Sequence, residues 1–224
     1  HKALRGVGFP AFVPKKVGAL EADIRAIARE FVDRMIAMGP ECDFAKDVAF
    51  LYPLRVIMTV LGVPREDEAF MLKLTQELFN ANDPDLSRDA KASTPIEIAQ
   101  SLQQTMIDLE NYFEVVTTEF RARPRDVVNS VIANAMINGE YLNRRQLMGY
   151  YIIAATAGHD TTSNTIAAGF WALAERPDVF RQIKADPGLV GGFIEESIRW
   201  STPVKHFMRS ATADTEVAGQ KIAK

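Results

Sequence analysis

The sequence predicts a mainly α-helical fold with strands only near the C-terminal end. Through most of the 224 residues, apolar side chains recur every three or four positions, as on a helix face that packs against a core. Glycine and proline end these runs. After Pro203 the pattern changes to short alternating segments with turns near Asp214 and Gly219, which is typical of strands.

The expected helices follow one another with clear boundaries. A short helix opens the chain and is broken at Pro10, a second ends at Gly39, and a third ends at Gly62. Residues 80–95 are polar and rich in Pro, Asp and Ser, which indicates a mobile loop. The remaining helices are expected at 65–79, 96–123, 126–136 and 142–175, from Pro177 onward, and at 189–200.

The composition excludes several classes of protein. A hydrophobic fraction of 47% with 25% charged residues is typical of a globular protein, and a net charge of −3 gives no basic excess for nucleic acid. Cys42 is the single cysteine, so no internal disulfide forms, which fits a reducing cytoplasmic compartment. The most apolar window, 147–174, contains His159 and Asp160, and an Asp costs a few kcal/mol in lipid, so no membrane span is expected.

Both ends of the sequence look cut. The chain opens at His1 within a helix-like pattern and stops at Lys224, where a strand pattern has barely begun. We therefore expect these residues to be a fragment of a longer protein.

The stretch IIAATAGHDTTSNTIAAG, residues 152–169, places polar residues at the centre of an apolar helix. One interpretation is a helix break, with Gly158 ending one helix and Asp160 capping the next. The other is a single unbroken helix over 142–175, because one face keeps helical spacing throughout. Past Tyr151 that face carries only small residues, which allow another helix or a flat ligand to lie close; the face comprises Leu147, Tyr151, Ala154, Gly158, Thr161, Thr165, Ala168 and Ala172. We expect the unbroken helix.

Asp160 would then lie in the middle of a helix that crosses the interior. A buried carboxylate needs a partner or a chemical task. Thr161 beside it has a hydroxyl that both donates and accepts a proton. The pair is therefore a candidate proton relay.

Glu196 and Arg199 are three residues apart and share one helix face. An ordinary ion pair worth a few tenths of a kcal/mol remains an open interpretation. Apolar neighbours such as Ile198 and Trp200 indicate partial burial, and a buried pair of this kind fixes local geometry more than it stabilises.

Several motifs together resemble the haem-thiolate monooxygenases, the cytochromes P450. The long central helix of that family carries Ala/Gly-Gly-x-Asp/Glu-Thr-Thr/Ser, and residues 157–162 read AGHDTT. The family's Glu-x-x-Arg is matched by Glu196 and Arg199, about forty residues later. The opening HKALR is similar to the family's His-x-x-x-Arg, and Arg209 lies in a segment similar to the strand after the Glu-x-x-Arg helix. The resemblance covers essentially the whole chain, so residues 1–224 are expected to be part of a single cytochrome P450 domain.

The resemblance implies a cofactor and roles for named residues. The cofactor is haem b, and the reaction inserts one oxygen atom of dioxygen into a C–H bond, with oxidoreductase chemistry supplied by the haem. Asp160 and Thr161 would relay protons during dioxygen activation. His1, Arg5 and Arg209 would hold the haem propionates, since charged donors bind carboxylates strongly. Ala157 and Gly158 would leave room for dioxygen beside the haem, and Glu196 and Arg199 would be structural. His1 also has the interpretation of a solvated chain end.

The chain departs from the family at the metal ligand. Family members bind haem iron through a Cys thiolate in a Phe-x-x-Gly-x-x-x-Cys-x-Gly loop, and no such loop occurs here. Cys42 is expected to be a small buried hydrophobe, not a ligand. The iron ligand is therefore expected beyond Lys224, and these 224 residues alone should be inactive and form no thiolate-ligated haem site.

The resemblance is strongest to soluble bacterial members that hydroxylate terpenoids and related small hydrocarbons. Such enzymes take electrons from NAD(P)H through a ferredoxin and its reductase. The expected substrate contacts are Ile153, Ala154, Val204 and Phe207, each of which could equally be plain core. The helix pair around the loop 80–95 would roof the pocket.

Two other classes remain as alternatives. One is a catalytically incompetent helical fragment, or a binding or scaffold protein of the same fold without haem, in which Asp160 and Arg209 are satisfied structurally. The other is a hydrolytic metal site at His159 and Asp160. Adjacent helix residues point about 100° apart, so these two converge poorly on one ion.

Overall fold

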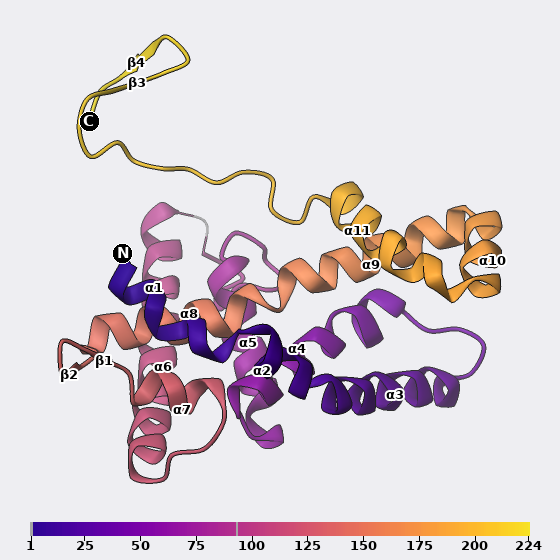
Figure 1. Ribbon diagram of the computed structural model, residues 1–224, viewed down its shortest axis with the longest axis horizontal. Coiled ribbons are helices and arrows are strands. Elements are labelled where there is room, and N and C mark those ends of the chain that lie inside the picture. The colour runs from indigo at the N-terminus through magenta and orange to yellow at the C-terminus, as the bar shows by residue number, and fades with distance from the viewer. Residues whose placement is uncertain (1, 93) are drawn as a thin grey trace. The chain divides into compact units, whose positions relative to one another are not determined.

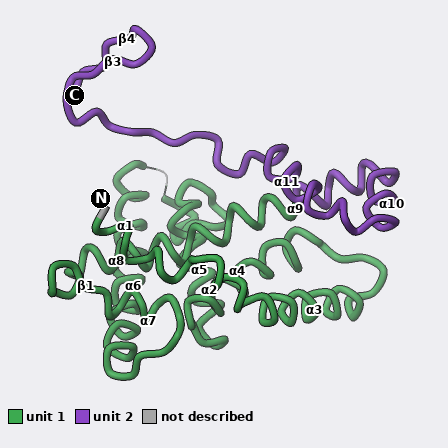
Figure 2. The backbone as a smooth tube through the Cα atoms, in the orientation of Figure 1, with its two compact units in different colours: residues 1–167 green, residues 168–224 purple. Residues whose placement is uncertain are grey.

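The computed structural model describes residues 2–92 and 94–224, and their ribbon is shown in Figure 1. The chain forms two compact units, His1–Ala167 and Ala168–Lys224, coloured separately in Figure 2. No helix of the described residues is long and apolar enough to cross a membrane.

The first unit is built from helices and one short hairpin. The 3₁₀-helices η1 and η3 span Phe9–Ala11 and Arg65–Asp67, and the π-helix η2 spans Ala45–Ala49. The α-helices are α1 Lys2–Gly8, α2 Pro14–Ala19, α3 Glu21–Met38, α4 Leu51–Leu61, α5 Glu68–Phe79, α6 Pro95–Ala122, α7 Val128–Ala133 and α8 Arg144–Ala157, followed by the start of α9 Asp160–Glu175. The hairpin pairs β1 Met136–Ile137 with β2 Glu140–Tyr141 in antiparallel register.

The second unit contains the rest of α9 and the C-terminal elements. These are α10 Pro177–Ala185, the 3₁₀-helix η4 Pro187–Leu189, α11 Val190–Ser201, β3 Thr215–Val217 and β4 Gln220–Ile222. Strands β3 and β4 pair antiparallel, and Ala218 and Gly219 turn between them with positive φ. The mainly helical fold with strands toward the C-terminal end is confirmed.

Strands are not confined to the C-terminal end. The sequence predicted a helix over 126–136. In the structure α7 ends at Ala133, and Met136 begins strand β1 of the hairpin. Asn138 and Gly139 both adopt positive φ, at 54° and 84°. An Asn-Gly pair favours this two-residue hairpin turn, so the local chemistry outweighed the helical pattern before it.

Two capping boxes fix where α6 and α8 begin. Thr94 accepts from the backbone N–H of Glu97 at 3.3 Å, and the Glu97 carboxylate accepts from the backbone N–H of Thr94 at 2.9 Å. Asn143 and Gln146 repeat the arrangement at the start of α8, with both bonds at 3.0 Å. Such caps contribute about 1 kcal/mol each.

The core of the first unit lies where α4, α5, α6 and α8 meet. Phe113 and Tyr151 are fully buried and stack in parallel with 4.5 Å between ring centroids. The Tyr151 hydroxyl hydrogen-bonds that of Thr117 at 2.9 Å, and burial raises the pKa of Tyr151. Other fully buried side chains, each worth about 1.5–3 kcal/mol, are Met58, Leu61, Met71, Leu74 and Leu109. This core therefore holds α8 in place.

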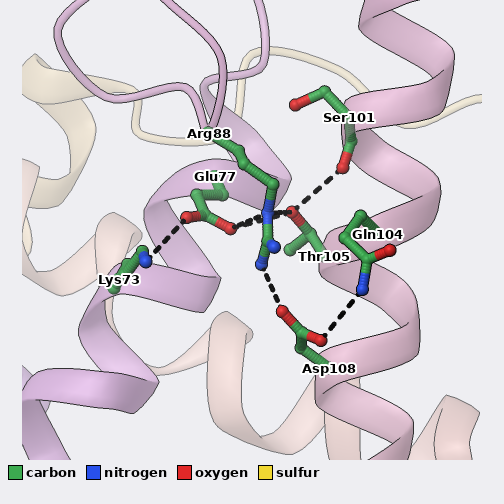
Figure 3. A network of polar contacts seen from close by, with 7 residues as sticks. All are labelled: Lys73, Glu77, Arg88, Ser101, Gln104, Thr105 and Asp108. Atoms are coloured by element: carbon green, nitrogen blue, oxygen red, sulfur yellow. Dashed lines mark hydrogen bonds and ion pairs between the residues drawn. The ribbon is translucent and has the colours of Figure 1, made fainter.

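Arg88 attaches the loop between α5 and α6 to both helices (Figure 3). Its Nε donates to the Glu77 carboxylate at 2.8 Å and to the Thr105 hydroxyl at 3.1 Å, and its Nη2 donates to Asp108 at 2.6 Å. The Glu77 side chain is only 3% exposed, and Lys73 lies 3.8 Å from its other oxygen. The predicted mobile loop is therefore tied down at one point by a buried ion pair.

Two expectations about burial are wrong in this structure. Cys42 is exposed, because it precedes η2 in an irregular segment and does not enter a helix face. Glu196 and Arg199 form the expected pair, with bonds of 2.6 and 2.7 Å, but their side chains are 59% and 66% exposed. The neighbouring Trp200 is 62% exposed, so it does not bury them.

Candidate functional site

The stretch that links α8 to α9 is a helix break. Gly158 ends α8 with φ −87° and ψ −8°, and the backbone N–H of His159 donates to the Thr156 carbonyl, three residues back, at 3.2 Å. Helix α9 resumes at Asp160, and its first turn closes when Ser163 N–H donates to the His159 carbonyl at 2.9 Å. The prediction of one unbroken helix over 142–175 is therefore wrong.

The apolar spacing continues across the break because the backbone stays right-handed there. The backbone of Gly158 stays in the right-handed region, so the chain keeps winding in the same sense through a tight turn. Spacing alone could not detect an interruption of two residues. The alternative of a break at Gly158 was correct, although Asp160 is the first helical residue and not the cap.

Thr161 is placed directly across this break. Its hydroxyl donates to the carbonyl of Ala157, four residues back, at 3.0 Å. Thr165 repeats this contact one turn later with the carbonyl of Thr161, at 2.8 Å. The hydroxyl therefore satisfies a carbonyl at the end of α8, as threonine does at distorted helix turns.

Asp160 lies beside a buried histidine. Its carboxylate oxygen Oδ1 is 3.4 Å from Nδ1 of His159, and the Asp160 side chain is 35% exposed. The His159 side chain is 1% exposed, and its Nε2 lies 2.9 Å from the backbone carbonyl oxygen of Phe50. The expectation of a buried Asp160 with a bonded partner is wrong, because about a third of its side chain is exposed and Nδ1 of His159 makes no hydrogen bond to it.

Gly158 allows another helix to approach the break closely. A Cβ atom at Gly158 would lie 3.0 Å from Cδ1 and 3.1 Å from Cγ1 of Ile57, on α4. The body that lies against this glycine is therefore a helix side chain. Ala157, in contrast, is exposed.

An apolar pocket of about 390 Å³ lies beside the break. It brings together four residues that the sequence analysis selected, namely Ile153, Ala154, Ala157 and Gly158. The opposite walls come from the end of α1, the segment after it, α4 and α7; they comprise Gly8, Ala11, Phe12, Ile57, Val128, Val131 and Ile132, and Tyr150 of α8 completes the lining. A pocket of this size and character suits a small hydrophobic group.

Arg5 lines a neighbouring open cavity of about 430 Å³ together with Arg145. Tyr150 and Ile153 line both cavities, so the two lie on either side of the same wall. Within residues 2–92 and 94–224, neither Arg5 nor Arg145 forms an ion pair with a carboxylate. Two guanidinium groups beside an apolar wall suit a ligand that is apolar and carries carboxylates.

The other predicted residues belong to other parts of the chain. His1 lies outside the described residues. Arg209, Val204 and Phe207 belong to the second unit, in the irregular segment before β3, and all three are exposed. The Arg209 guanidinium donates to the Met208 carbonyl at 2.8 Å.

Sequence reasoning missed two residues of the site. Arg145 stands in the first turn of α8, two residues after the capping Asn143, and only its place near Arg5 distinguishes it from a surface arginine. His159 was considered only as a metal ligand. Its one sequence signal was its position inside an otherwise small and hydroxyl-rich stretch.

The residues present fit the cofactor that the resemblance implies. Haem is a flat apolar ring with two carboxylates, and this chain offers an apolar pocket beside a helix break with two unpaired guanidinium groups nearby. In the described part of the chain, no group of three or more His, Cys, Asp and Glu side chains is arranged to hold a metal ion.

Comparison with known proteins gives a consistent result. The family model for Cytochrome P450 matches residues 1–187. Cytochrome P450-terp of Pseudomonas sp is 41% identical over 225 residues, which cover 100% of this chain and 53% of that protein. A methyl-branched lipid omega-hydroxylase of Mycobacterium tuberculosis is 30% identical over 226 residues, covering 100% and 51%.

Solved structures agree with the sequence relatives. The crystal structure of CYP108D1 from Novosphingobium aromaticivorans matches with a TM-score of 0.86 and 46% identity, covering 100% of this chain and 51% of that one. CYP268A2 of Mycobacterium marinum, in complex with pseudoionone, matches with a TM-score of 0.88 and 30% identity, covering 100% and 53%. The chain spans about half the length of the curated relatives that it matches.

Proposed function

Because the chain belongs to the cytochrome P450 family, we propose that it supplies the distal half of the active site of a haem-dependent monooxygenase. The whole protein would insert one oxygen atom of dioxygen into a C–H bond of a small hydrophobic, terpenoid-like substrate. Residues 1–224 would form part of a single domain with the segment that carries the thiolate ligand. The observation that carries this proposal is the α8–α9 break, where Asp160 and Thr161 lie next to an apolar pocket.

Five residues of this chain would hold the cofactor. Ala157 and Gly158 lie on the pocket wall, and Arg5 lies beside it with an unpaired guanidinium group. His1 and Arg209 are carried over from the family motif alone. When bound, haem b supplies the activation of dioxygen and the transfer of one oxygen atom.

The role of Asp160 and Thr161 is to hold and move a proton. The Thr161 hydroxyl donates to the Ala157 carbonyl, so its oxygen lone pairs are free to accept a hydrogen bond. Asp160 is one residue away and about one third exposed, so it can exchange protons with water. A proton that reaches the Thr161 oxygen would move on only as the hydroxyl releases its own hydrogen to an acceptor in the pocket. Proton transfer by a positioned side chain accelerates a reaction about 10²–10⁴-fold.

The substrate class rests on pocket chemistry and on relatives. The pocket wall contains Ile153 and Ala154, with no charged side chain among its lining residues. Val204 and Phe207 are the further proposed contacts. The names and ligands of several relatives point to hydrophobic compounds: P450-terp, a methyl-branched lipid omega-hydroxylase, a steroid C26-monooxygenase and a pseudoionone complex.

The remaining parts of the proposal concern partners. Electrons would come from NAD(P)H through a ferredoxin and its reductase, in the cytoplasm. Glu196 and Arg199 would act structurally, as a bidentate pair on α11.

Two measurements on the whole protein test the proposal. Reduced protein with CO should show a thiolate-type Soret band, and terpenoids should produce a larger spin-state shift than fatty acids or sterols. A whole protein that binds no haem would instead support a haem-free scaffold of the same fold. A larger shift with fatty acids would retain the monooxygenase and reject the terpenoid class.

A further inference from the structure

His159 is the buried titratable side chain that the proposed proton relay leaves unused. It occupies the last position before α9 and is 1% exposed. Its ring contacts Phe50 edge-on, with 4.6 Å between ring centroids and 64° between planes. Phe50 directly precedes α4, so this contact joins the break to a part of the chain 109 residues away.

The partner of Nε2 determines which ring nitrogen carries the proton. Nε2 lies 2.9 Å from the Phe50 carbonyl oxygen, and a carbonyl can only accept. Nε2 must therefore be the donor, and in the neutral ring Nδ1 is left with its lone pair. The anchor thus fixes the tautomer of His159.

Nδ1 makes no hydrogen bond to any described residue, although Oδ1 of Asp160 lies 3.4 Å away. Ser163, one turn along α9, is also buried, and its hydroxyl is likewise without a protein partner in the described part of the chain. No Lys or Arg of the described residues lies within 4 Å of the Asp160 carboxylate.

The ring is buried and bonded through Nε2, so it cannot turn away from Phe50 without breaking that bond. A broken bond would leave Nε2 unpaired away from water, which is penalised. The anchor therefore holds the backbone directly before Asp160 and Thr161.

The segment before α4 winds irregularly. Residues Ala45–Ala49 form the π-helix η2, and the backbone N–H of Phe50 bonds the carbonyl of Ala45, five residues back, at 3.0 Å. Pro53 has no N–H, so it cannot donate to the carbonyl of Ala49. The next carbonyl along the chain, that of Phe50, accepts from His159.

We propose that His159 is a positioning residue: Nε2 ties the α8–α9 break to Phe50 and so holds Asp160 and Thr161 at their places in the break. This inference rests on the proposed function, because it assigns the relay a group that positions it. The hydrogen bond from Nε2 and the packing of the ring are separable properties of one side chain.

Two variants separate the hydrogen bond from the packing of the ring. In His159→Gln the side-chain N–H can still reach the Phe50 carbonyl. In His159→Phe the ring still packs on Phe50, but the hydrogen bond is lost. Amide hydrogen exchange over residues 156–163 of the whole protein should stay near wild type in His159→Gln and rise about tenfold or more in His159→Phe. Unchanged exchange in His159→Phe would overturn the anchor.

The hydrogen bond from Nε2 has its own spectroscopic test. In whole protein with ¹⁵N-labelled histidine, in the diamagnetic reduced CO form, the His159 signals are identified by their loss in His159→Gln. We expect a proton on Nε2. A bare Nε2 would overturn the inference.

These outcomes are distinguishable from a failure of the proposed function. A whole protein that forms no thiolate-type CO complex would refute the monooxygenase, and the tautomer and exchange could still be measured in its CO-free form. Conversely, a normal CO complex with a bare Nε2 would retain the monooxygenase and reject the role of His159.

Discussion

The break between α8 and α9 and the Glu196–Arg199 pair on α11 carry the two most recognisable motifs of the chain, and they differ in how they are held. At the break, His159 is 1% exposed and bonded to Phe50, which lies 109 residues away. The pair on α11 is bidentate, yet it is bonded only to itself and is mostly exposed. The comparison shows that a motif acquires a defined geometry from long-range contacts, and that spacing within one helix is not enough.

The largest effect is expected at Asp160. Asp160→Asn keeps the shape of the side chain and removes its proton-carrying group, so the rate of product formation by the whole protein should fall about a hundredfold. The CO complex should be unchanged. Comparison of turnover with the CO spectrum checks this, and a loss of both would mean that the substitution disturbs haem binding instead.

Arg88→Ala should lower the free energy of unfolding by about 3 kcal/mol. It leaves the Glu77 carboxylate buried with the Thr105 hydroxyl as a neutral donor and Lys73 at 3.8 Å, and breaking a buried pair by removing one partner costs about 3–5 kcal/mol. Urea unfolding measures the change. The matched control is Arg25→Ala, whose pair with Glu21 is exposed and should contribute less than about 1 kcal/mol. Equal losses in both variants would contradict the contrast between buried and exposed pairs.

Gly158→Ala should destabilise by about 1–3 kcal/mol, because its new methyl group would crowd Ile57 on α4. Gly149→Ala, on the same α8, meets nothing within 4 Å and should be neutral or stabilising by up to about 1 kcal/mol. The double variant Gly158→Ala with Ile57→Val removes the nearest atom and should recover part of the loss. Denaturant unfolding of all three checks the contact, and no rescue would reject it.

The tie between Arg88 and Asp108 should weaken in acid. The hydrogen bond from Arg88 holds the pKa of Asp108 below its usual value. The pKa of Asp108 is therefore lower in the folded state than in the unfolded chain, where it is about 3.9. Above that pH the stabilisation from the pair is complete. The stabilisation is lost as the pH falls through the folded-state pKa. Amide exchange over residues 80–92, corrected for the intrinsic pH dependence, should therefore rise below about pH 4. Asp108→Asn should exchange faster already at neutral pH and lose this dependence.

The smallest effect is expected at the exposed pair. Arg199→Gln should leave the unfolding of this 224-residue chain unchanged, because both partners lie in solvent. Thermal unfolding measures this. A clear loss of stability would show that the pair has partners beyond its own helix and would remove the contrast with the break.

Much of the fold was predictable from the apolar periodicity and from the residues that begin and end helices. The long helix expected at 96–123 is α6, and Pro177 begins α10, because proline and the capping residues act locally. The β1–β2 hairpin was missed because an Asn-Gly turn was read as a helix end. The break after Gly158 was missed because its backbone stays right-handed.

The site was predictable only in part. Asp160 and Thr161 follow from a local motif, and the Ile153–Gly158 wall follows from the size pattern of one helix face. The Phe50–His159 contact and the position of Arg145 beside Arg5 depend on tertiary packing, which spacing within a helix does not contain.

The most direct test measures how the electrons from NAD(P)H divide between hydroxylated product and hydrogen peroxide when the Thr161 hydroxyl is removed. In the whole protein, Thr161→Ala should consume NAD(P)H at nearly the wild-type rate while most of the electrons appear as hydrogen peroxide and not as hydroxylated product. The control is Thr162→Ala, an exposed neighbour that should remain coupled. Full coupling in Thr161→Ala, or equal uncoupling in both variants, would contradict a proton relay at the α8–α9 break.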